Sequence, residues 1–261
     1  MSRTRVLPEL LRITPTALDT FAWCSRRYLL KHGFGLPESD AGRSSDQGLL
    51  VHDLLRHIHE RGSCHDAALV DEVVTAHADD DAVRLMIDRH RTRCPMTFDA
   101  QAHEIARARY HHRPVPMFLA TARIDAVWVH DGIFDVRDYK TGSRAVGDLR
   151  DDVRAQVQAW VFAPRAQARG LRLQLRYEYL SPEAGDDPEP WSPDTDDLDD
   201  ITERLRRRVT QIRESDFRGV GEPETCTPCP YRSICPDSAT PGVPTWPALA
   251  LDDPDLAPAG D

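Results

Sequence analysis

The sequence predicts an α/β protein with a mixed central sheet and helices packed against it. Its segments follow one another in the order helix, three strands, helix, strand, which is typical of such a sheet. Near residue 103 the pattern changes from apolar residues at helical spacing to short, partly alternating runs enriched in β-branched and aromatic residues. An Asp-Gly pair between two of these runs indicates a hairpin.

Two helices are predicted before the strands. Thr14 and Pro15 mark a helix start, because threonine caps free N–H groups and proline tolerates the first helical position. This helix is expected to run from about Pro15 to His32. The segment "QGLLVHDLLRHIHERG" places four apolar residues on one face of a second helix: Leu50, Leu54, Leu55 and Ile58. More helices are expected between about 63 and 95, as a polar insertion at the surface.

Three strands are predicted in "HEIARARY", "MFLATARIDAVWVH" and "GIFDVRDYK", and the last two are joined through His130, Asp131 and Gly132. A helix from about Asp151 to Ala168 and a strand in "LRLQLRYEYL" follow. The spacing of four apolar residues predicts a last helix with an arginine-rich outer face: Ile201, Leu205, Val209 and Ile212.

The composition is that of a soluble globular protein, with 40% hydrophobic and 29% charged residues. No uninterrupted apolar run approaches the roughly 18 residues that a membrane helix needs, so no membrane-spanning segment is expected. The N-terminal stretch lacks a long apolar core followed by a small-residue cleavage site. Secretion is therefore not expected, and a cytoplasmic location is.

The net charge of −10 argues at first against an anionic partner such as DNA. The acids are unevenly distributed, however. Residues 181–200 contain nine acids and residues 251–261 contain four, and neither segment contains Lys or Arg. Removing these thirteen negative charges leaves about +3 on the remainder. The acidity therefore does not exclude a nucleic-acid partner.

The chain is expected to form one domain over residues 1–237. It would include the helical insertion at about 63–95 and an acidic loop at about 181–200. The remaining residues, 238–261, are rich in Pro and acids and poor in aliphatic residues. We expect this tail to be disordered, because such a composition cannot bury a core.

The stretch "VRDYKTGSR" contains the residues best suited to chemistry. On a strand, Asp138 and Lys140 share one face and Tyr139 lies on the other. Asp125 lies on the neighbouring strand of the predicted hairpin. Two carboxylates that converge across strands supply oxygen ligands for Mg²⁺, and a nearby ammonium can orient a water and stabilise charge on a phosphate. A lone D-x-K tripeptide is more often a surface Asp and Lys at a strand end.

Two further motifs support a metal site. A G-x-x-x-H pattern ends in His52 at the start of the second helix, where a histidine can be a further metal ligand. Gln156 and Trp160 lie four apart on one face of the helix that follows the lysine. The alternatives are that His52 is an ordinary histidine of the polar face and that Gln156 is an exposed residue beside a core tryptophan.

Six cysteines in a cytoplasmic protein are not expected to form a disulfide framework. The segment "CTPCPYRSIC" spaces Cys226, Cys229 and Cys235 as C-x₂-C-x₅-C, and its prolines keep the backbone looped. Three thiolates need a fourth ligand to complete either a zinc site or an iron–sulfur cluster. Ligand type alone does not separate these two alternatives.

Cys24 is the best candidate for that fourth ligand. It lies in the first predicted helix, whereas Cys64 and Cys94 fall in the expected insertion. A bond across about 200 residues would tie the two ends of the domain together and restrict the unfolded chain. For Cys64 and Cys94, the alternative of unligated buried cysteines stays open.

Taken together and in this order, the motifs resemble the RecB-type iron–sulfur branch of the PD-(D/E)XK nuclease superfamily. This branch includes the nuclease domain of AddB helicase–nucleases and the CRISPR-associated spacer-acquisition exonucleases. The resemblance rests on "ITPTALDTFAWCSRRYLL", "GLLVH", "ARIDAV", "DYKTG", "QVQAW" and "CTPCPYRSIC". Ser25 stands where a Pro is common, and Trp160 where a Tyr is usual. Gln158 and Phe162, also four apart, fit the glutamine position as well.

The resemblance implies a restriction-endonuclease-like core and a role for each matched residue. His52, Asp125 and Asp138 would bind Mg²⁺ or Mn²⁺. Lys140 would assist the attacking water, and Gln156 would complete the catalytic set. The four cysteines would hold a [4Fe–4S] cluster, with Zn²⁺ as the alternative: Cys24, Cys226, Cys229 and Cys235. Glu104 matches an acid that is often seen on the first strand, and no role is assigned to it.

The implied function is a metal-dependent exonuclease that hydrolyses DNA, expected to be single-stranded, in repair, recombination or foreign-DNA processing. Four bases are candidates to meet the phosphate backbone, although exposed arginines are usually solvated surface: Arg26, Arg27, Arg123 and Arg144. One alternative is a CRISPR spacer-acquisition nuclease that works with an integrase. Another is an inactive module that binds DNA or a helicase, but the intact Asp125, Asp138 and Lys140 argue against it.

Overall fold

The computed structural model describes residues 10–38, 46–77, 80–97, 102–115, 118–142 and 147–240. The chain divides into two compact units. The larger unit is built from the described residues of Leu7–Asp19 and Ser44–Glu214, and the smaller from those of Thr20–Arg43 and Ser215–Asp261. Among the described residues, no helix combines the length and apolarity needed to cross a membrane.

A five-stranded mixed sheet forms the centre of the larger unit. Its strands are β1 (Leu11–Ile13), β2 (His103–Val115), β3 (Phe118–His130), β4 (Ile133–Lys140) and β5 (Arg172–Tyr179). The path β1-β3-β4-β5 has parallel pairs at both ends, and β3 pairs antiparallel with β2 and β4. The mixed sheet that the sequence predicts is therefore confirmed. The strand β1 was not predicted from the sequence, because it is only three residues long.

The predicted turn between β3 and β4 is also present. Asp131 and Gly132 both have positive φ, 44° and 70°, as a two-residue type I′ turn requires. Glycine accepts this backbone at no steric cost, and aspartate is one of the few other residues that tolerate it. The turn fixes the register of the hairpin, in which Ala126 pairs with Arg137.

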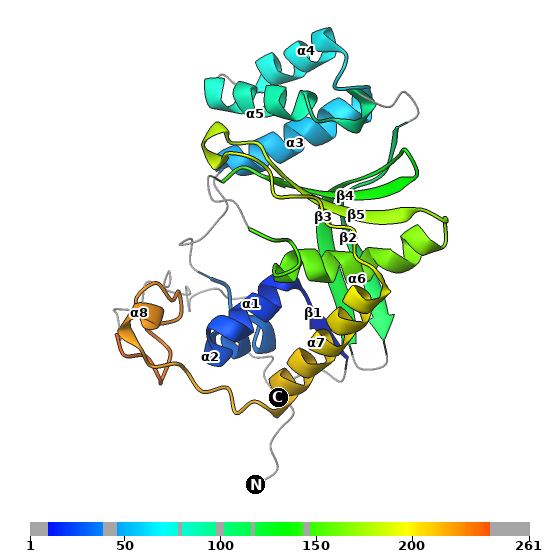
Figure 1. Ribbon diagram of the computed structural model, residues 1–261. Helices are drawn as coiled ribbons and strands as arrows, with labels where there is room; N and C mark the ends of the chain where they lie inside the picture. The colour runs from blue at the N-terminus through cyan, green and yellow to red at the C-terminus, as the bar shows by residue number, and fades with distance from the viewer. Residues whose placement is uncertain are drawn as a thin grey trace, which may run out of the picture. The chain divides into compact units, whose positions relative to one another are not determined.

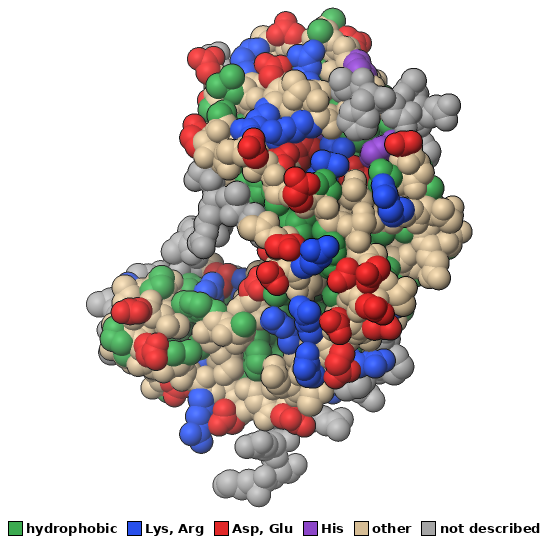
Figure 2. All heavy atoms as spheres, viewed as in Figure 1, with side chains coloured by type: hydrophobic (Ala, Val, Ile, Leu, Met, Phe, Trp, Pro, Cys, Tyr) green, Lys and Arg blue, Asp and Glu red, His purple; other side chains and the backbone are tan. Residues whose placement is uncertain are grey.

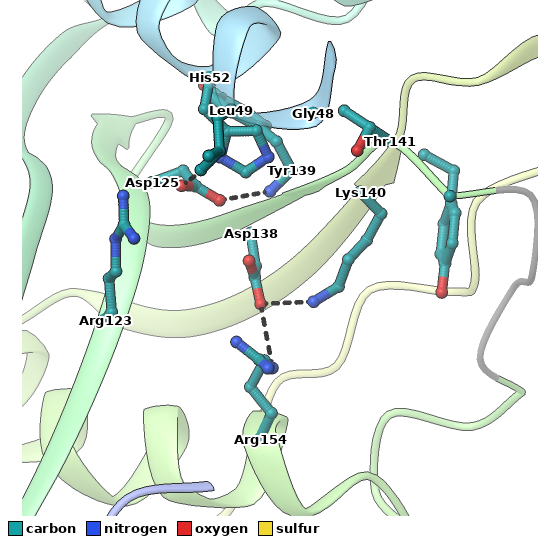
Figure 3. Close-up of a pocket in the computed structure, with 12 residues that line it drawn as sticks. Gly48, Leu49, His52, Arg123, Asp125, Asp138, Tyr139, Lys140, Thr141 and Arg154 are labelled. Atoms are coloured by element: carbon teal, nitrogen blue, oxygen red, sulfur yellow. Dashed lines mark hydrogen bonds and ion pairs between the residues drawn. The ribbon is translucent and has the colours of Figure 1, made fainter. Parts of the chain in front are cut away.

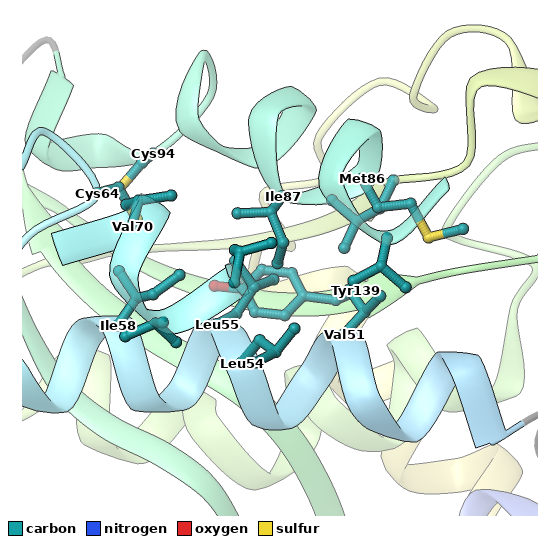
Figure 4. Packing of buried hydrophobic residues seen from close by; sticks show 14 of the residues in the cluster. Val51, Leu54, Leu55, Ile58, Cys64, Val70, Met86, Ile87, Cys94 and Tyr139 are labelled. Atoms are coloured by element: carbon teal, nitrogen blue, oxygen red, sulfur yellow. The ribbon is translucent and has the colours of Figure 1, made fainter. Parts of the chain in front are cut away.

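Three helices cover one face of the sheet (Figure 1). They are α3 (Asp46–Arg61), α4 (Ala67–His77) and α5 (Asp81–Arg91), followed by a 3₁₀ turn, η2 (Pro95–Thr97). The apolar face of α3 points into a cluster that it shares with α4, α5 and Tyr139 of the sheet (Figure 4). In that face Val51 is fully buried, whereas Leu50 is only partly buried. The insertion is thus helical as predicted, and it contributes buried core as well as surface.

Two helices cover the other face. α6 (Val153–Gln167) begins after Asp152, whose side chain accepts a hydrogen bond from the Ala155 N–H at 2.8 Å. The ring of Trp160 on α6 stacks on Phe118 of β3 and donates through Nε1 to Thr202 of α7 (Thr195–Glu214) at 2.8 Å. Figure 2 shows acidic and basic side chains interspersed over α7.

The acidic stretch 181–200 is a loop only in its first part. It contains a 3₁₀ turn, η3 (Pro182–Ala184), and α7 begins within it at Thr195. Asp194 and Asp197 exchange side-chain-to-backbone hydrogen bonds across the first turn of α7. Acids are favoured at this end, because it carries the positive pole of the helix dipole. The loop that was predicted to extend to residue 200 therefore ends before Thr195, because residues 195–200 are helical.

The smaller unit contains α2 (Ser25–Tyr28), a π-helical turn, η1 (Leu29–Gly33), and α8 (Pro223–Cys226). The single helix expected from Pro15 to His32 is interrupted, because α1 (Pro15–Trp23) ends before Cys24, which is extended with φ −164° and ψ 116°. Arg26 pairs with Asp237 at 3.0 Å, tying the two segments of this unit together. The predicted disordered tail lies largely outside the described residues, at 241–261.

Candidate active site

Two carboxylates lie beyond the last regular pair of the β3–β4 hairpin. That pair is Ala126 opposite Arg137, so Asp125 and Asp138 are the next residues on their strands. Their side chains are largely buried, with 9% and 8% exposed, and both line the same cavity. The structure brings these two predicted site residues together.

His52 reaches Asp125 from α3. Its Nδ1 lies 2.8 Å from Asp125 Oδ1, and the Tyr139 N–H donates to Asp125 Oδ2 at 2.8 Å (Figure 3). Gly48 lies one helical turn before His52 and lines the same cavity. The G-x-x-x-H pattern therefore places a histidine beside the first carboxylate.

Three cationic or amide groups surround Asp138, and all approach its Oδ2. Lys140 Nζ donates to it at 2.7 Å and Gln158 Nε2 at 3.2 Å, while Arg154 Nε lies 3.8 Å away (Figure 3). Asp138 and Lys140 share a face of β4, as the two-residue period of a strand predicts. Arg154 and Gln158 are four apart on α6, so both extend from one face of that helix.

The surroundings separate the two acids electrostatically. Burial raises the pKa of Asp138. The charge of Lys140 acts to lower this pKa and the charge of Asp125 acts to raise it, and the net shift is upward. Burial also acts to raise the pKa of Asp125, but the hydrogen bond and charge of His52 outweigh it, and the pKa is lowered. Burial acts to lower the pKa of His52, yet Asp125 outweighs it and the pKa is raised. Two neighbouring carboxylates repel each other, so this pair favours a cation between them.

A cavity of about 330 Å³ opens over this pair. Its lining includes the two acids and His52, and three bases surround them: Arg123, Lys140 and Arg154. Hard oxygen donors therefore lie next to positive charge. This combination suits a divalent cation together with an anionic group such as a phosphate.

The structure places Gln156 outside this cavity. Its Nε2 donates to the Arg150 carbonyl at 2.6 Å. Gln158, by contrast, contacts Asp138 and also the Arg123 carbonyl, at 3.3 Å. Two residues correspond to about 200° around a helix axis, so the two glutamines point in different directions. Gln158 is therefore the glutamine of this helix that contacts a carboxylate of the site, whereas a catalytic role for Gln156 stays a prediction.

The other predicted contact residues differ in position. Arg123 is exposed at the rim of the cavity. Arg26 and Arg27 belong to the smaller unit, where Arg27 pairs with Glu38 at 2.7 Å. Arg144 and the side chain of Glu104 lie outside the described residues. Arg154 was not predicted from the sequence, although its place one turn before Gln158 is the pattern that would have identified it.

The four cysteines assigned to a cluster line one cavity of the smaller unit: Cys24, Cys226, Cys229 and Cys235. Burial raises the pKa of the Cys229 and Cys235 thiols, and Cys24 lies close enough to contribute to both shifts. The break after α1 leaves Cys24 between two helices. The sequence had predicted that Cys24 lies inside a single helix. Four cysteine sulfurs around one cavity fit either a zinc ion or an iron–sulfur cube.

The mixed sheet, its flanking helices and the acids at the end of its hairpin define a restriction-endonuclease-like protein. The sequence profile of the PD-(D/E)XK nuclease superfamily matches residues 12–236. The chain belongs to this superfamily, whose members are hydrolases that act on nucleic acids and use divalent metals.

Two phage proteins resemble part of the chain. The Gene 69 proteins of Mycobacterium phages L5 and D29 are 32% identical to it over 115 and 118 residues, which is 43% and 45% of this chain. The matches span 38% and 43% of those proteins. A crystal structure of a protein from Eubacterium rectale, provisionally assigned as an exonuclease, has a TM-score of 0.48 and 11% identity. It covers 81% of this chain and 84% of its own.

Proposed function

We propose that this protein is a metal-dependent exonuclease that hydrolyses the phosphodiester bonds of DNA. The observation that carries the proposal is the cavity in which His52, Asp125, Asp138 and Lys140 converge. Their carboxylate and imidazole groups match the donors that Mg²⁺ and Mn²⁺ accept, and we assign His52, Asp125 and Asp138 as the ligands. When bound, such an ion lowers the pKa of a coordinated water and offsets charge on the phosphate.

Lys140 is assigned two roles at the scissile phosphate. Its Nζ lies 2.7 Å from Asp138 Oδ2 and 4.2 Å from the centre of the Tyr177 ring, so two contacts hold the ammonium at the mouth of the site. From this position it can donate a hydrogen bond to the attacking water and offset negative charge that develops on the phosphate oxygens. The side chain is 22% exposed, which leaves the ammonium accessible to substrate.

Gln158 and Arg154 are assigned to position Asp138. Gln158 Nε2 bridges Asp138 Oδ2 and the Arg123 carbonyl, so it connects the two strands that carry the acids. Arg154 lines the cavity and is the nearest guanidinium to Asp138 among the described residues. Both keep the carboxylate oriented, and Arg154 and Arg123 can also contact the phosphate backbone of the substrate.

The finer features of the proposal come from the resemblance of the sequence motifs. They are single-stranded DNA as the substrate, an exonuclease mode, and a cytoplasmic role in repair, recombination or foreign-DNA processing. The cavity is supported as a DNA site by its three bases, which offset the acidity of the chain as a whole. A [4Fe–4S] cluster on the four cysteines is part of the same proposal, and their common cavity supports it.

Digestion of end-labelled DNA tests the proposal. Full-length protein, purified without oxygen, would be incubated with single- and double-stranded substrates in the presence of Mg²⁺ or Mn²⁺. Asp138→Asn should lower cleavage by about a thousandfold, because the site loses a ligand and the partner of Lys140. Asp53→Asn is the matched control, since Asp53 neighbours His52 on α3 but is 68% exposed and outside the cavity.

The outcomes separate the alternatives. Wild-type cleavage that is lost in Asp138→Asn and kept in Asp53→Asn supports the proposal. Equal cleavage by all three proteins would show that the site is wrongly assigned. DNA binding without cleavage by the wild type, under every metal condition, would instead indicate the inactive binding module.

A further inference from the structure

A second group of metal-type side chains lies in the larger unit, away from the cavity. It consists of His59, Cys64, His90 and Cys94. One ligand atom from each lies within 4.8 Å of all the others. Among the described residues, no other group of histidines, cysteines and acids has its ligand atoms this close together. We infer that these four residues bind a structural Zn²⁺ ion that fastens the helical insertion.

The distances agree with one shared ion. His59 Nε2 lies 2.7 Å from Cys64 Sγ, 3.3 Å from His90 Nε2 and 3.9 Å from Cys94 Sγ. Tetrahedral zinc with Zn–N and Zn–S bonds of roughly 2.1 and 2.3 Å separates its ligand atoms by about 3.4–3.8 Å. Two of the three separations lie within about 0.1 Å of this range, and the separation of His59 Nε2 from Cys64 Sγ is shorter, so these two groups would move apart to hold an ion.

Each half of the group has the same local design. His59 lies in the last turns of α3 and Cys64 in the turn that follows it. His90 lies in the last turn of α5 and Cys94 in the turn after that helix. The spacings are H-x₄-C and H-x₃-C. Figure 4 shows Cys64 and Cys94 next to each other at one end of the apolar cluster. The ion would thus join the beginning and the end of the insertion.

Burial supports a closed, structural site. His90 and Cys94 are 0% exposed, Cys64 3% and His59 6%. A structural zinc site has four protein ligands and no open position, whereas a catalytic one keeps a position for water or substrate. A zinc ion with two thiolates and two neutral imidazoles carries no net charge.

An acid outside the group fixes the orientation of His90. Nδ1 of His90 lies 2.7 Å from Oε1 of this acid, Glu178, and both side chains are fully buried. Glu178 Oε2 accepts a hydrogen bond from Arg137 Nη1 at 3.1 Å, which balances the charge of the carboxylate. Zinc-ligating histidines almost always donate their other ring N–H to such an acceptor. This contact leaves the Nε2 of His90 aimed at the other three ligands, and it is independent of the clustering itself.

The donor set selects zinc over the proposed Mg²⁺ or Mn²⁺ of the cavity. Thiolates and imidazoles suit Zn²⁺, whereas the harder ions prefer oxygen. The site also lies next to the strand that carries the active residues, because the His90 ring packs on Tyr139 with centroids 5.0 Å apart. An ion here would hold the insertion against β4.

Zinc analysis of the full-length protein tests the inference. Cys226→Ser/Cys229→Ser serves as the background, because it removes thiols that could bind zinc in the smaller unit. We expect about one zinc per chain in this background, in the manner of a structural site. Adding Cys64→Ser/Cys94→Ser should remove it, and adding His57→Ala, which changes a neighbouring histidine of α3 outside the group, should not.

Co²⁺ in place of zinc provides a second readout that does not require a disrupted site. The background protein should show tetrahedral cobalt bands and a thiolate charge-transfer band. His59→Cys should keep the metal and strengthen the charge-transfer band, because three cysteines and one histidine also form a zinc set. Absence of zinc and of cobalt bands from the wild-type protein and from a background protein that keeps the wild-type circular dichroism spectrum would overturn the inference. So would a disulfide-linked Cys64–Cys94 peptide recovered from protein prepared without oxygen.

Discussion

The two faces of β4 carry two different polar sites. On one face, Asp138 and Lys140 point to the cavity, with side chains 8% and 22% exposed. On the other, Asp135, Arg137 and Tyr139 are buried beneath the insertion, and Arg137 is 1% exposed. Alternation along a single strand thus separates a site that must admit substrate from one that must exclude water.

The difference shows how burial serves two purposes with similar charged groups. In the cavity, the like charges of Asp125 and Asp138 are adjacent. Their repulsion favours the binding of a cation. Beneath the insertion, each charge has an opposite partner: Arg137 pairs with Asp135 at 2.8 Å and with Glu178 at 3.1 Å. One face is built for binding and the other for support.

The largest effect is expected on the supporting face. Arg137→Met should lower the free energy of unfolding by about 3–5 kcal/mol, because it removes the buried guanidinium that pairs with both Asp135 and Glu178. Burial opposes the charge of Arg137, but Asp135 and Glu178 outweigh it and its pKa is raised. Urea unfolding measures the loss. Arg204→Met is the control, since Arg204 lies on α7 and pairs loosely with Asp200 at 3.9 Å. Equal losses for both variants would contradict the role of the network.

On the cavity face, Lys140→Met should act on rate rather than on stability. We expect kcat to fall by about 10²–10³-fold, because the variant removes a charged donor from the transition state. The free energy of unfolding should change by less than about 1 kcal/mol, since Lys140 is partly exposed and Arg154 stays beside Asp138. Single-turnover cleavage and urea unfolding measure the two quantities. A large fall in stability with an unchanged rate would reverse the comparison between the faces.

The two glutamines of α6 offer a matched pair. Gln158→Ala should lower cleavage by about tenfold, because the Asp138 carboxylate loses a hydrogen-bond donor. Gln156→Ala should leave the rate within about twofold, since its side chain bonds to the Arg150 carbonyl instead. Parallel rate measurements on the two variants decide between them. The opposite ranking would restore the glutamine assignment made from the sequence.

The smallest effect is expected at the rim of the cavity. Arg123→Ala should raise KM a few-fold with little change in kcat, because an exposed arginine contributes binding to phosphate and not chemistry. The slope of log affinity against log salt should become shallower by about one for a lost phosphate contact. Binding of single-stranded DNA over a range of salt concentrations measures it. An unchanged slope would show that Arg123 does not contact a phosphate of the DNA.

The sequence predicted those features of the site that depend on local geometry. Asp138 and Lys140 share a face because a strand has a period of two, and the Asp131-Gly132 turn brings Asp125 beside them. Both rules act over a few residues. The strands β2 to β5, the helices α6 and α7 and the helical character of the insertion were predicted for the same reason.

What the sequence did not reveal depends on how distant segments meet. Gln156 and Gln158 fit the same motif, and only the rotation of α6 against the sheet distinguishes them. Cys64 and Cys94 come together because α5 returns to the end of α3, and short H-x-C spacings alone are too common to predict this. The extended backbone at Cys24 likewise contradicts the helical periodicity around it.

The alternation on β4 gives the hairpin turn a role in folding fidelity. A strand that paired one residue out of register would send Asp138 and Lys140 into the apolar core under α3 and would turn Tyr139 toward the cavity. Neither face could tolerate the exchange. The positive φ angles of Asp131 and Gly132 fix the loop at two residues. The turn therefore disfavours a misfolded state in which the residues of the two faces of β4 would be exchanged.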